Sequence, residues 1–314
     1  MSTRYLRQLS LSVVLSMAMS QIIAQSYRRY VHDADSCFKI GEYDASLKFY
    51  SQAFAIKSDV PRDFYNAACS ASLGGANHFA VALLKLAVDN GWMDINHLES
   101  DADLRPLHSM PEWFTLTSDL RKKIEVFERG FDWPLQAELL AVFESANAIR
   151  QEYSNISHDE PDKKVKGDSV LKIMRRVDSV NVIKVSKILD ERGWVGNDLV
   201  GAQASDAIYY AMQHADLQTL VKYFPLLKEA VERKTVRIEF LAYMDDRIAV
   251  GQGREQTYGS LLGFNSQTGK YFVHPVKDPQ EVDRRRDLVG LGPMNDYVRM
   301  YGIKWDPKNP GQEK

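Results

Sequence analysis

The chain has 314 residues, of which 45% are hydrophobic and 26% charged, the balance of a folded protein with one large or two ordinary domains. Its 15 tyrosines and 5 tryptophans exclude wholesale disorder. The formal net charge of -2 supplies no broad positive field, so we expect no nucleic-acid partner.

Residues 1–24 have the pattern of a secretory signal peptide. Arg4 and Arg7 form a positively charged start, and residues 9–24 are largely apolar or small and contain no acid. Cleavage after Ala24 would leave an exported chain, periplasmic or secreted, with no stable membrane span. An uncleaved N-terminal anchor is the alternative.

A period of 34 residues follows. Six positions recur with residues of the same kind, since Ala34, Gly41, Ser46, Leu47, Tyr50 and Ala53 are followed 34 residues later by Ala68, Gly75, Ala80, Val81, Leu84 and Ala87. The small residues allow two helices to approach closely, and each glycine suits the turn between them. The spacing predicts two helical hairpins that turn at Gly41 and Gly75.

This pattern resembles the tetratricopeptide repeat over about residues 27–90, with a capping helical segment through about residue 128. The first unit departs from it at Ser46, where alanine is common. The resemblance implies a concave surface for a protein or peptide partner. A scaffold for the next domain is an equal alternative. We assign residues 25–130 to this helical domain.

Two cysteines, Cys37 and Cys69, lie in the first helices of the two units. Export would permit a disulfide between them, but two free thiols are the more usual outcome for small buried cysteines. The sequence leaves both possibilities open.

The second half, residues 131–305, is predicted to be mainly helical with one small β-hairpin, and residues 306–314 form a tail. Proline and glycine in a polar stretch predict a loop over residues 154–168. The turn at Asn265–Gly269 predicts a hairpin. The expected elements are helices over 135–153, 179–192, 203–216, 217–233 and 236–250, strands over 257–264 and 270–276, and a last helix that begins at Asp278.

Several short motifs follow one another in this half: Gly193-Trp194, Val200-Gly201, Gln213-His214-Ala215-Asp216, Asp246-Arg247, Gly253 with Gln256-Thr257-Tyr258-Gly259, and Val282-Asp283-Arg284-Arg285-Arg286 with Gly290-Leu291. In order and spacing they resemble the uncharacterised bacterial domain of unknown function numbered 6624, over about residues 133–305. The resemblance implies a fold but no activity. One departure is Ala146-Asn147 before Arg150, where the family usually has an Asp-Gln pair.

Two arginines are predicted on the core side of their helices. At 100° per residue, Arg247 falls inside the apolar stripe that includes Val236 and Phe240, and Arg285 projects between Leu288 and Val289. A buried guanidinium without a partner costs several kcal/mol, so each must meet an anion. For Arg247 the candidates are Asp206, Asp216 and Asp283 in a structural network, or an incoming ligand.

His214 is a candidate general base at the edge of the apolar face of helix 203–216, with Asp206 or Asp216 to orient it. A structural histidine is the more common case. His214 and Asp216 could hold a metal, but the spacing supplies no third ligand. No sequence motif for a metal or cofactor is present, and we expect neither.

The leading hypothesis is an exported binding or scaffolding protein, in which the repeats contact a protein and the second half takes an anionic small ligand. The alternative is an envelope hydrolase with His214 as base and with Arg247 and Arg285 on an anionic substrate. The candidate ligand-binding residues are Arg247, Asp246, Gln213, Gln256, Tyr258, Arg285 and Arg286.

Overall fold

The computed structural model describes residue 23 and residues 25–156 and 161–308. The predicted signal peptide therefore lies outside the described residues apart from Ile23, and so does most of the predicted tail. The chain divides into two compact units, Met1–Phe127 and Glu128–Lys314.

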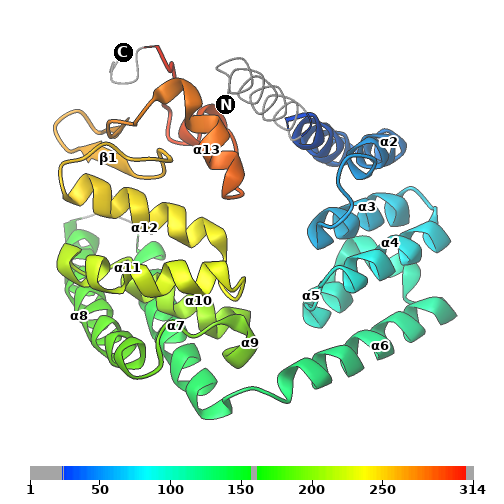
Figure 1. Cartoon of the computed structure of the whole chain (residues 1–314), viewed down its shortest axis with the longest axis horizontal. Coiled ribbons are helices and arrows are strands. Elements are labelled where there is room, and N and C mark those ends of the chain that lie inside the picture. Colours follow the sequence, from blue (N-terminus) through cyan, green and yellow to red (C-terminus); the bar gives the residue numbers. More distant parts are fainter. Residues whose placement is uncertain (1–22, 24, 157–160, 309–314) are drawn as a thin grey trace, which may run out of the picture. The chain divides into compact units, whose positions relative to one another are not determined.

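The N-terminal unit is built from helices alone within its described part (Figure 1). Its central helix, α3, packs against its neighbours α2 and α4 and against the 3-10 helix η1. The elements in chain order are a helix over residues 25–39, α2 (Tyr43–Phe54), α3 (Pro61–Leu73), α4 (Asn77–Asp89), α5 (Ile95–Ser100), η1 (Ala102–Leu107) and α6 (Pro111–Glu128).

The two predicted turns are confirmed. Gly41 and Gly75 have φ angles of 80° and 79°, a conformation that glycine adopts without the strain a side chain would add. The small repeat residues are buried as expected, including Ser46, Ala53, Ala68, Ala80 and Ala87. The Ser46 hydroxyl is not left unsatisfied, because it lies 2.9 Å from the Ser70 hydroxyl. Serine is therefore tolerated at this position.

The C-terminal unit contains further helices and a single hairpin in its described part (Figure 1). The two strands pair antiparallel, with Leu262 opposite Val273. The elements are α7 (Trp133–Ser154), α8 (Pro161–Arg192), α9 (Asn197–Val200), α10 (Ala202–Met212), α11 (Leu217–Glu232), α12 (Ile238–Gly251), β1 (Leu262–Asn265), β2 (Lys270–Val273), η2 (Pro279–Glu281), α13 (Val282–Leu288) and α14 (Met294–Arg299). The predicted class, mainly α with one small β-hairpin, is confirmed.

The core of this unit lies between α7, α8, α10, α11 and α12. Helix α7 packs against α8 and α10, and α11 packs against α12. Leu139, Ile208 and Met212 are fully buried at its centre, together with Leu227 and Phe240. Burial of each such side chain contributes about 1.5–3 kcal/mol, so this cluster holds α10 and α12 firmly in place.

The predicted loop over residues 154–168 is wrong from Pro161 onward, because α8 begins at that proline. Proline is well tolerated in the first turn of a helix, where its missing N–H has no helical partner. Val170, Met174 and Val177 then follow at helical spacing and pack against Ile149. The packing of these apolar residues stabilises the helix, which includes the charged segment from Pro161 onward.

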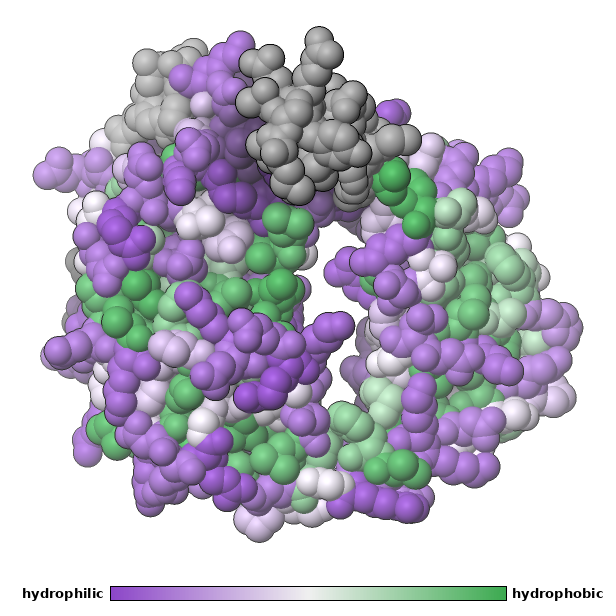
Figure 2. Space-filling model, viewed as in Figure 1, coloured by the Kyte–Doolittle hydropathy of each residue, from purple (hydrophilic) through white to green (hydrophobic). Residues whose placement is uncertain are grey.

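Neither cysteine forms a disulfide, since Cys37 and Cys69 are both free thiols. Hydrophilic residues predominate on the visible face of each unit, and apolar residues form separate smaller patches (Figure 2). Among the described residues, none of the helices combines the length and the apolar character needed to cross a membrane.

Candidate ligand site in the C-terminal unit

A cavity of about 360 Å³ lies among α10, α11, α12, α14 and the segment before β1. Two arginines and no acidic residue face it, so its lining is electropositive. Five of the other ten lining residues are aromatic. The lining residues are Tyr209, Tyr210, Gln213, Leu220, Arg237, Phe240, Tyr243, Met244, Arg247, Ser260, Leu261 and Tyr297.

Arg247 lies on α12 and faces this cavity half-buried. Its guanidinium forms no hydrogen bond or ion pair with any residue that the structure describes. The three predicted partners are engaged elsewhere, since Asp206 pairs with Arg237, Asp216 accepts from Thr219 N, and Asp283 accepts from Met294 N. None of these three acids therefore forms the predicted structural network with Arg247. The charge remains available to an anion that enters the cavity.

The second cavity arginine, Arg237, is already neutralised. Its Nη1 lies 3.4 Å from Asp206 Oδ2, and its guanidinium lies 5.1 Å from the centre of the Phe240 ring. Burial raises the pKa of Asp206, and the charge of Arg237 opposes that shift. Asp206, a candidate to orient His214, is instead the counter-ion of Arg237.

Stacked rings form one wall of the cavity. Tyr209 and Phe240 lie nearly parallel, with ring centroids 3.9 Å apart, and Tyr243 lies 6.2 Å from Tyr209. Burial raises the pKa of Tyr209 and of Tyr243, so both hydroxyls stay protonated and can donate a hydrogen bond at neutral pH. The site thus combines a cation, hydroxyl donors and a flat apolar surface.

Asp246, the residue before Arg247, is completely buried and holds the backbone that follows α12. Its carboxylate accepts hydrogen bonds from Thr257 N at 2.6 Å, Tyr258 N at 2.9 Å, and both Ser260 N and Ser260 Oγ at 2.8 Å. Burial raises the pKa of Asp246, and these hydrogen bonds oppose the rise. Asp246 was predicted to bind a ligand, but it instead positions Ser260 in the cavity wall.

Gln256 and Tyr258 also stabilise this segment and do not line the cavity. The buried Gln256 amide donates to the carbonyls of Leu261 at 3.1 Å and His274 at 2.9 Å, and it accepts from Leu261 N. Tyr258 packs against a small cluster that contains Val289 and Leu291. The motif Gln256-Thr257-Tyr258-Gly259 therefore stabilises the loop after α12.

Arg285 and Arg286 are held by backbone carbonyls, and neither lines the cavity. Arg285 donates to Thr257 O at 2.6 Å and to Lys277 O, and Arg286 donates to Gly292 O at 2.6 Å and Tyr258 O at 2.9 Å. The anion that the sequence led us to expect at Arg285 is thus replaced by carbonyl oxygens. Arg286 also lies 5.0 Å from the ring centre of Tyr297, a cavity residue.

His214 is not on the predicted helix, because α10 ends at Met212, and it does not line the cavity. Arg150 Nη2 lies 2.6 Å from His214 Nε2, and Asp178 Oδ2 lies 3.6 Å from Nδ1. A guanidinium can only donate, so Nε2 must accept and the proton must sit on Nδ1. Burial lowers the pKa of His214, against the effect of Asp178. The lone pair that a general base needs is therefore occupied.

Asp216, the other candidate beside His214, caps the N-terminus of α11 by accepting from Thr219 N at 2.8 Å. This hydrogen bond lowers the pKa of Asp216. Of the sequence-predicted site residues, only Arg247 and Gln213 face the cavity, and they do not meet His214 or Arg285 there. The geometry does not favour the hydrolase alternative.

Sequence reasoning missed the aromatic wall and Ser260. Phe240 was predicted in the apolar stripe of its helix, and Tyr209 was not singled out. Both side chains are almost wholly buried, at 2% and 5% exposed. Tyr210, about one turn before His214, is 37% exposed, and this exposure was a weak signal. Its ring centroid lies 5.8 Å from that of Phe240. No local pattern distinguishes a ring that lines a cavity from one that fills a core.

A family model with the description "Family of unknown function (DUF6624)" matches residues 133–306. The match includes every residue that lines the cavity and agrees with the resemblance seen in the sequence. It does not cover the repeat-like half. No curated protein and no solved structure matches the chain.

Proposed function

We propose that this chain, which belongs to the DUF6624 family, binds a small anionic ligand with an apolar part in the cavity of its C-terminal unit. One observation carries the proposal: the half-buried Arg247 faces the cavity without a counter-ion among the described residues. A guanidinium that has lost part of its hydration gains most from a carboxylate or phosphate that it can bind through two N–H groups.

The rest of the cavity supports this ligand class. The flat wall of Tyr209 and Phe240 suits a ring or another planar apolar group. Gln213 offers an amide that would fix the orientation of the ligand. Ser260 offers only an acceptor, because its N–H and its hydroxyl both donate to Asp246. The volume of about 360 Å³ falls within the range of small-molecule sites.

The test is a calorimetric titration of the full chain with phenyl phosphate and with benzoate, compared with an Arg247→Met variant. We expect the wild type to bind at least one probe and the variant to bind it about tenfold or more weakly. A hydrogen bond to a charged group contributes about 1.5–3 kcal/mol, which corresponds to that factor or more. Methionine retains the apolar stem of the side chain, so we expect the fold to remain intact.

Arg254→Met is the matched control, because Arg254 is exposed and, among the described residues, its guanidinium donates only to Gln252 Oε1. It removes the same charge at a place outside the cavity and should bind as the wild type does. Absence of binding by the wild type, or equal loss in both variants, would reject the proposal. An unfolded Arg247→Met protein would indicate a structural role and contradict it as well.

We also propose that the protein is exported and that its repeat-like unit contacts a protein or peptide. Support for export comes from the charged start and apolar run of residues 1–24. Support for the contact comes from the tetratricopeptide-like hairpins around Gly41 and Gly75. N-terminal sequencing of the protein from its own cells should begin at Gln25, and a chain that begins at the initiator would reject export with cleavage.

A further inference from the structure

A second cavity, of about 300 Å³, lies within the N-terminal unit. It is lined from the helix over residues 25–39 and from α2, α3, α5 and the start of η1. Three carboxylates face it, against one lysine. The lining residues are Asp35, Phe38, Lys39, Tyr50, Tyr65, Asn66, Cys69, His97, Asp101 and Asp103.

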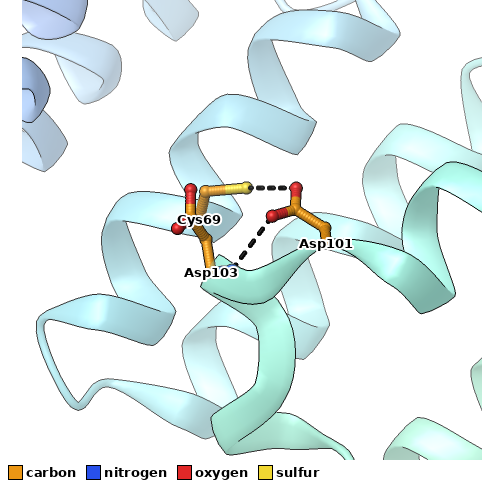
Figure 3. Close-up of side chains that lie close together, drawn as sticks. All are labelled: Cys69, Asp101 and Asp103. Carbon is orange, nitrogen blue, oxygen red and sulfur yellow. Dashed lines mark hydrogen bonds between the residues drawn. The ribbon is translucent and has the colours of Figure 1, made fainter.

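Three different side chains meet at one end of this cavity. The thiol of Cys69 on α3 faces the carboxylates of Asp101 and Asp103 at the start of η1 (Figure 3). One donor atom from each lies within 4.8 Å of the other two. His97 on α5 approaches the same place, with its Nε2 3.9 Å from Asp101 Oδ2.

Local structure fixes this arrangement. Asp101 caps η1, because its Oδ1 accepts from Asp103 N at 2.9 Å, and the cap turns the two carboxylates toward the same side. Its other oxygen, Oδ2, accepts from the Tyr65 hydroxyl at 2.8 Å. Such a hydrogen bond to a carboxylate orients it in the way that protein metal sites orient their ligands.

The cluster has excess negative charge and weak internal contacts. No lysine or arginine among the described residues pairs with Asp101 or Asp103, and the Asp103 carboxylate has no hydrogen-bond partner there. Cys69 is 5% exposed, yet its one polar contact through the thiol is a long 3.7 Å to Asp101 Oδ2. Two carboxylates beside a buried thiol repel each other, and this arrangement is unfavourable unless a cation binds between them.

We propose that Cys69, Asp101 and Asp103, with His97 as fourth ligand, bind a divalent cation of borderline softness such as Zn²⁺. Magnesium and calcium prefer oxygen alone, whereas a thiolate with imidazole and carboxylates suits zinc in tetrahedral geometry. The cation would displace the thiol proton of Cys69 to solvent as the metal–sulfur bond forms. This inference is independent of the ligand proposed for the C-terminal unit.

The test uses Co²⁺ as a coloured substitute for Zn²⁺ on the full chain after treatment with a chelator. We expect one equivalent of Co²⁺ to produce a thiolate-to-cobalt charge-transfer absorption in the near ultraviolet and Zn²⁺ to abolish it by displacement. Cys69→Ser should remove the absorption. Cys37→Ser is the control and should keep it, because Cys37 does not line the cavity.

Asp103→Asn provides a second variant in case Cys69→Ser fails to fold, because Asp103 is only half-buried and its carboxylate bonds to no described residue. It keeps the thiol but should weaken Co²⁺ binding by about tenfold or more, the usual effect of losing an element of a metal site. The proposal is overturned if the wild type shows no charge-transfer absorption, if Cys37→Ser loses it, or if Asp103→Asn binds as tightly as the wild type.

Discussion

Asp246 and Arg247 are neighbours on α12, but burial and pairing give them opposite roles. The Asp246 carboxylate is fully buried, and its hydrogen bonds hold three residues of the following segment. The Arg247 guanidinium remains without a counter-ion among the described residues and faces the cavity. One residue therefore stabilises the fold, and the next is available to a ligand.

We predict that Asp246→Ala lowers the free energy of unfolding by about 3 kcal/mol or more. The change leaves the partly buried N–H groups of Thr257, Tyr258 and Ser260 without their acceptor, and each unsatisfied group costs about 1–3 kcal/mol. Asp245→Ala is the control, since the Asp245 carboxylate accepts only from Thr257 Oγ1 among the described residues. Its loss should cost about 1 kcal/mol or less. Urea denaturation measures both, and equal losses would contradict the assignment.

The half-buried position of Arg247 could be predicted from the sequence, whereas the contacts of Asp246 could not, for a physical reason. The helical wheel places Arg247 among apolar residues, and the local period of the helix is all that this inference needs. The partners of Asp246 lie 11 to 14 residues further along the chain, in a loop whose path no periodicity predicts. Cys69 and Asp101 are 32 residues apart, farther than any local period reaches, and the thiol–carboxylate cluster was missed for the same reason.

At the scale of elements, Arg150, Asp178 and His214 tie together α7, α8 and the turn after α10. Arg150 Nη2 lies 2.9 Å from Asp178 Oδ1 and 2.6 Å from His214 Nε2. Ala146 and Asn147, where the resemblance expects an Asp-Gln pair, lie within one turn of Arg150 on α7, and Asp178 on α8 supplies an acid to this arginine instead.

This network predicts a pH dependence of stability. The pKa of His214 is lowered in the folded protein, so below about pH 6.5 the unfolded chain takes up a proton that the folded chain resists. Stability from this group is therefore complete above about pH 6.5 and is lost as the pH falls toward the folded pKa. His214→Gln removes the titration but can still accept from Arg150 and donate to Asp178.

Melting temperatures at about pH 7.5 and about pH 5.5 check this expectation. The wild type should lose more stability than His214→Gln over that interval, and the difference isolates His214 because all other groups are common to both proteins. If the two proteins lose the same amount, His214 does not have the lowered pKa that its burial implies.

Most helices were predictable because their apolar residues recur at helical spacing. One exception, besides the short helices α9 and α14, is the first half of α8, where local and tertiary preferences conflict. Proline, glycine and charges between residues 154 and 168 favour a loop locally, but the apolar face formed by Val170, Met174 and Val177 packs against α7 and extends the helix back to Pro161. Tertiary packing thus overrode the local signal.

At the scale of the whole molecule, the two units have separate cores. The core of the C-terminal unit draws its buried residues from Leu135 to Ile248, and that of the N-terminal unit from Ala34 to Leu120. The repeat period led us to expect a helical domain over residues 25–130, and the contacts divide the chain after Phe127. What each unit binds could not be predicted, because both cavities are formed by residues far apart in the chain.

We predict that residues 129–308 fold without the N-terminal unit, because their main core contains no residue outside that range. The fragment begins before Asp132, whose side chain caps α7 and pairs with Arg192. Circular dichroism should show a helical spectrum and a cooperative thermal transition, and the fragment should bind phenyl phosphate or benzoate as the full chain does. A fragment that lacks a cooperative transition would show that the two units depend on each other.

The hydrogen bonds to Asp246 fix part of the cavity wall before any ligand binds. Ser260 is fixed through both its N–H and its hydroxyl before anything enters, and the ring pair of Tyr209 and Phe240 is held by the core. A molecule that enters such a preorganised site loses little of its binding free energy to ordering of the protein. Immobilisation of the long Arg247 side chain then accounts for most of the entropy lost by the protein, so stiffening that side chain is the route to tighter association.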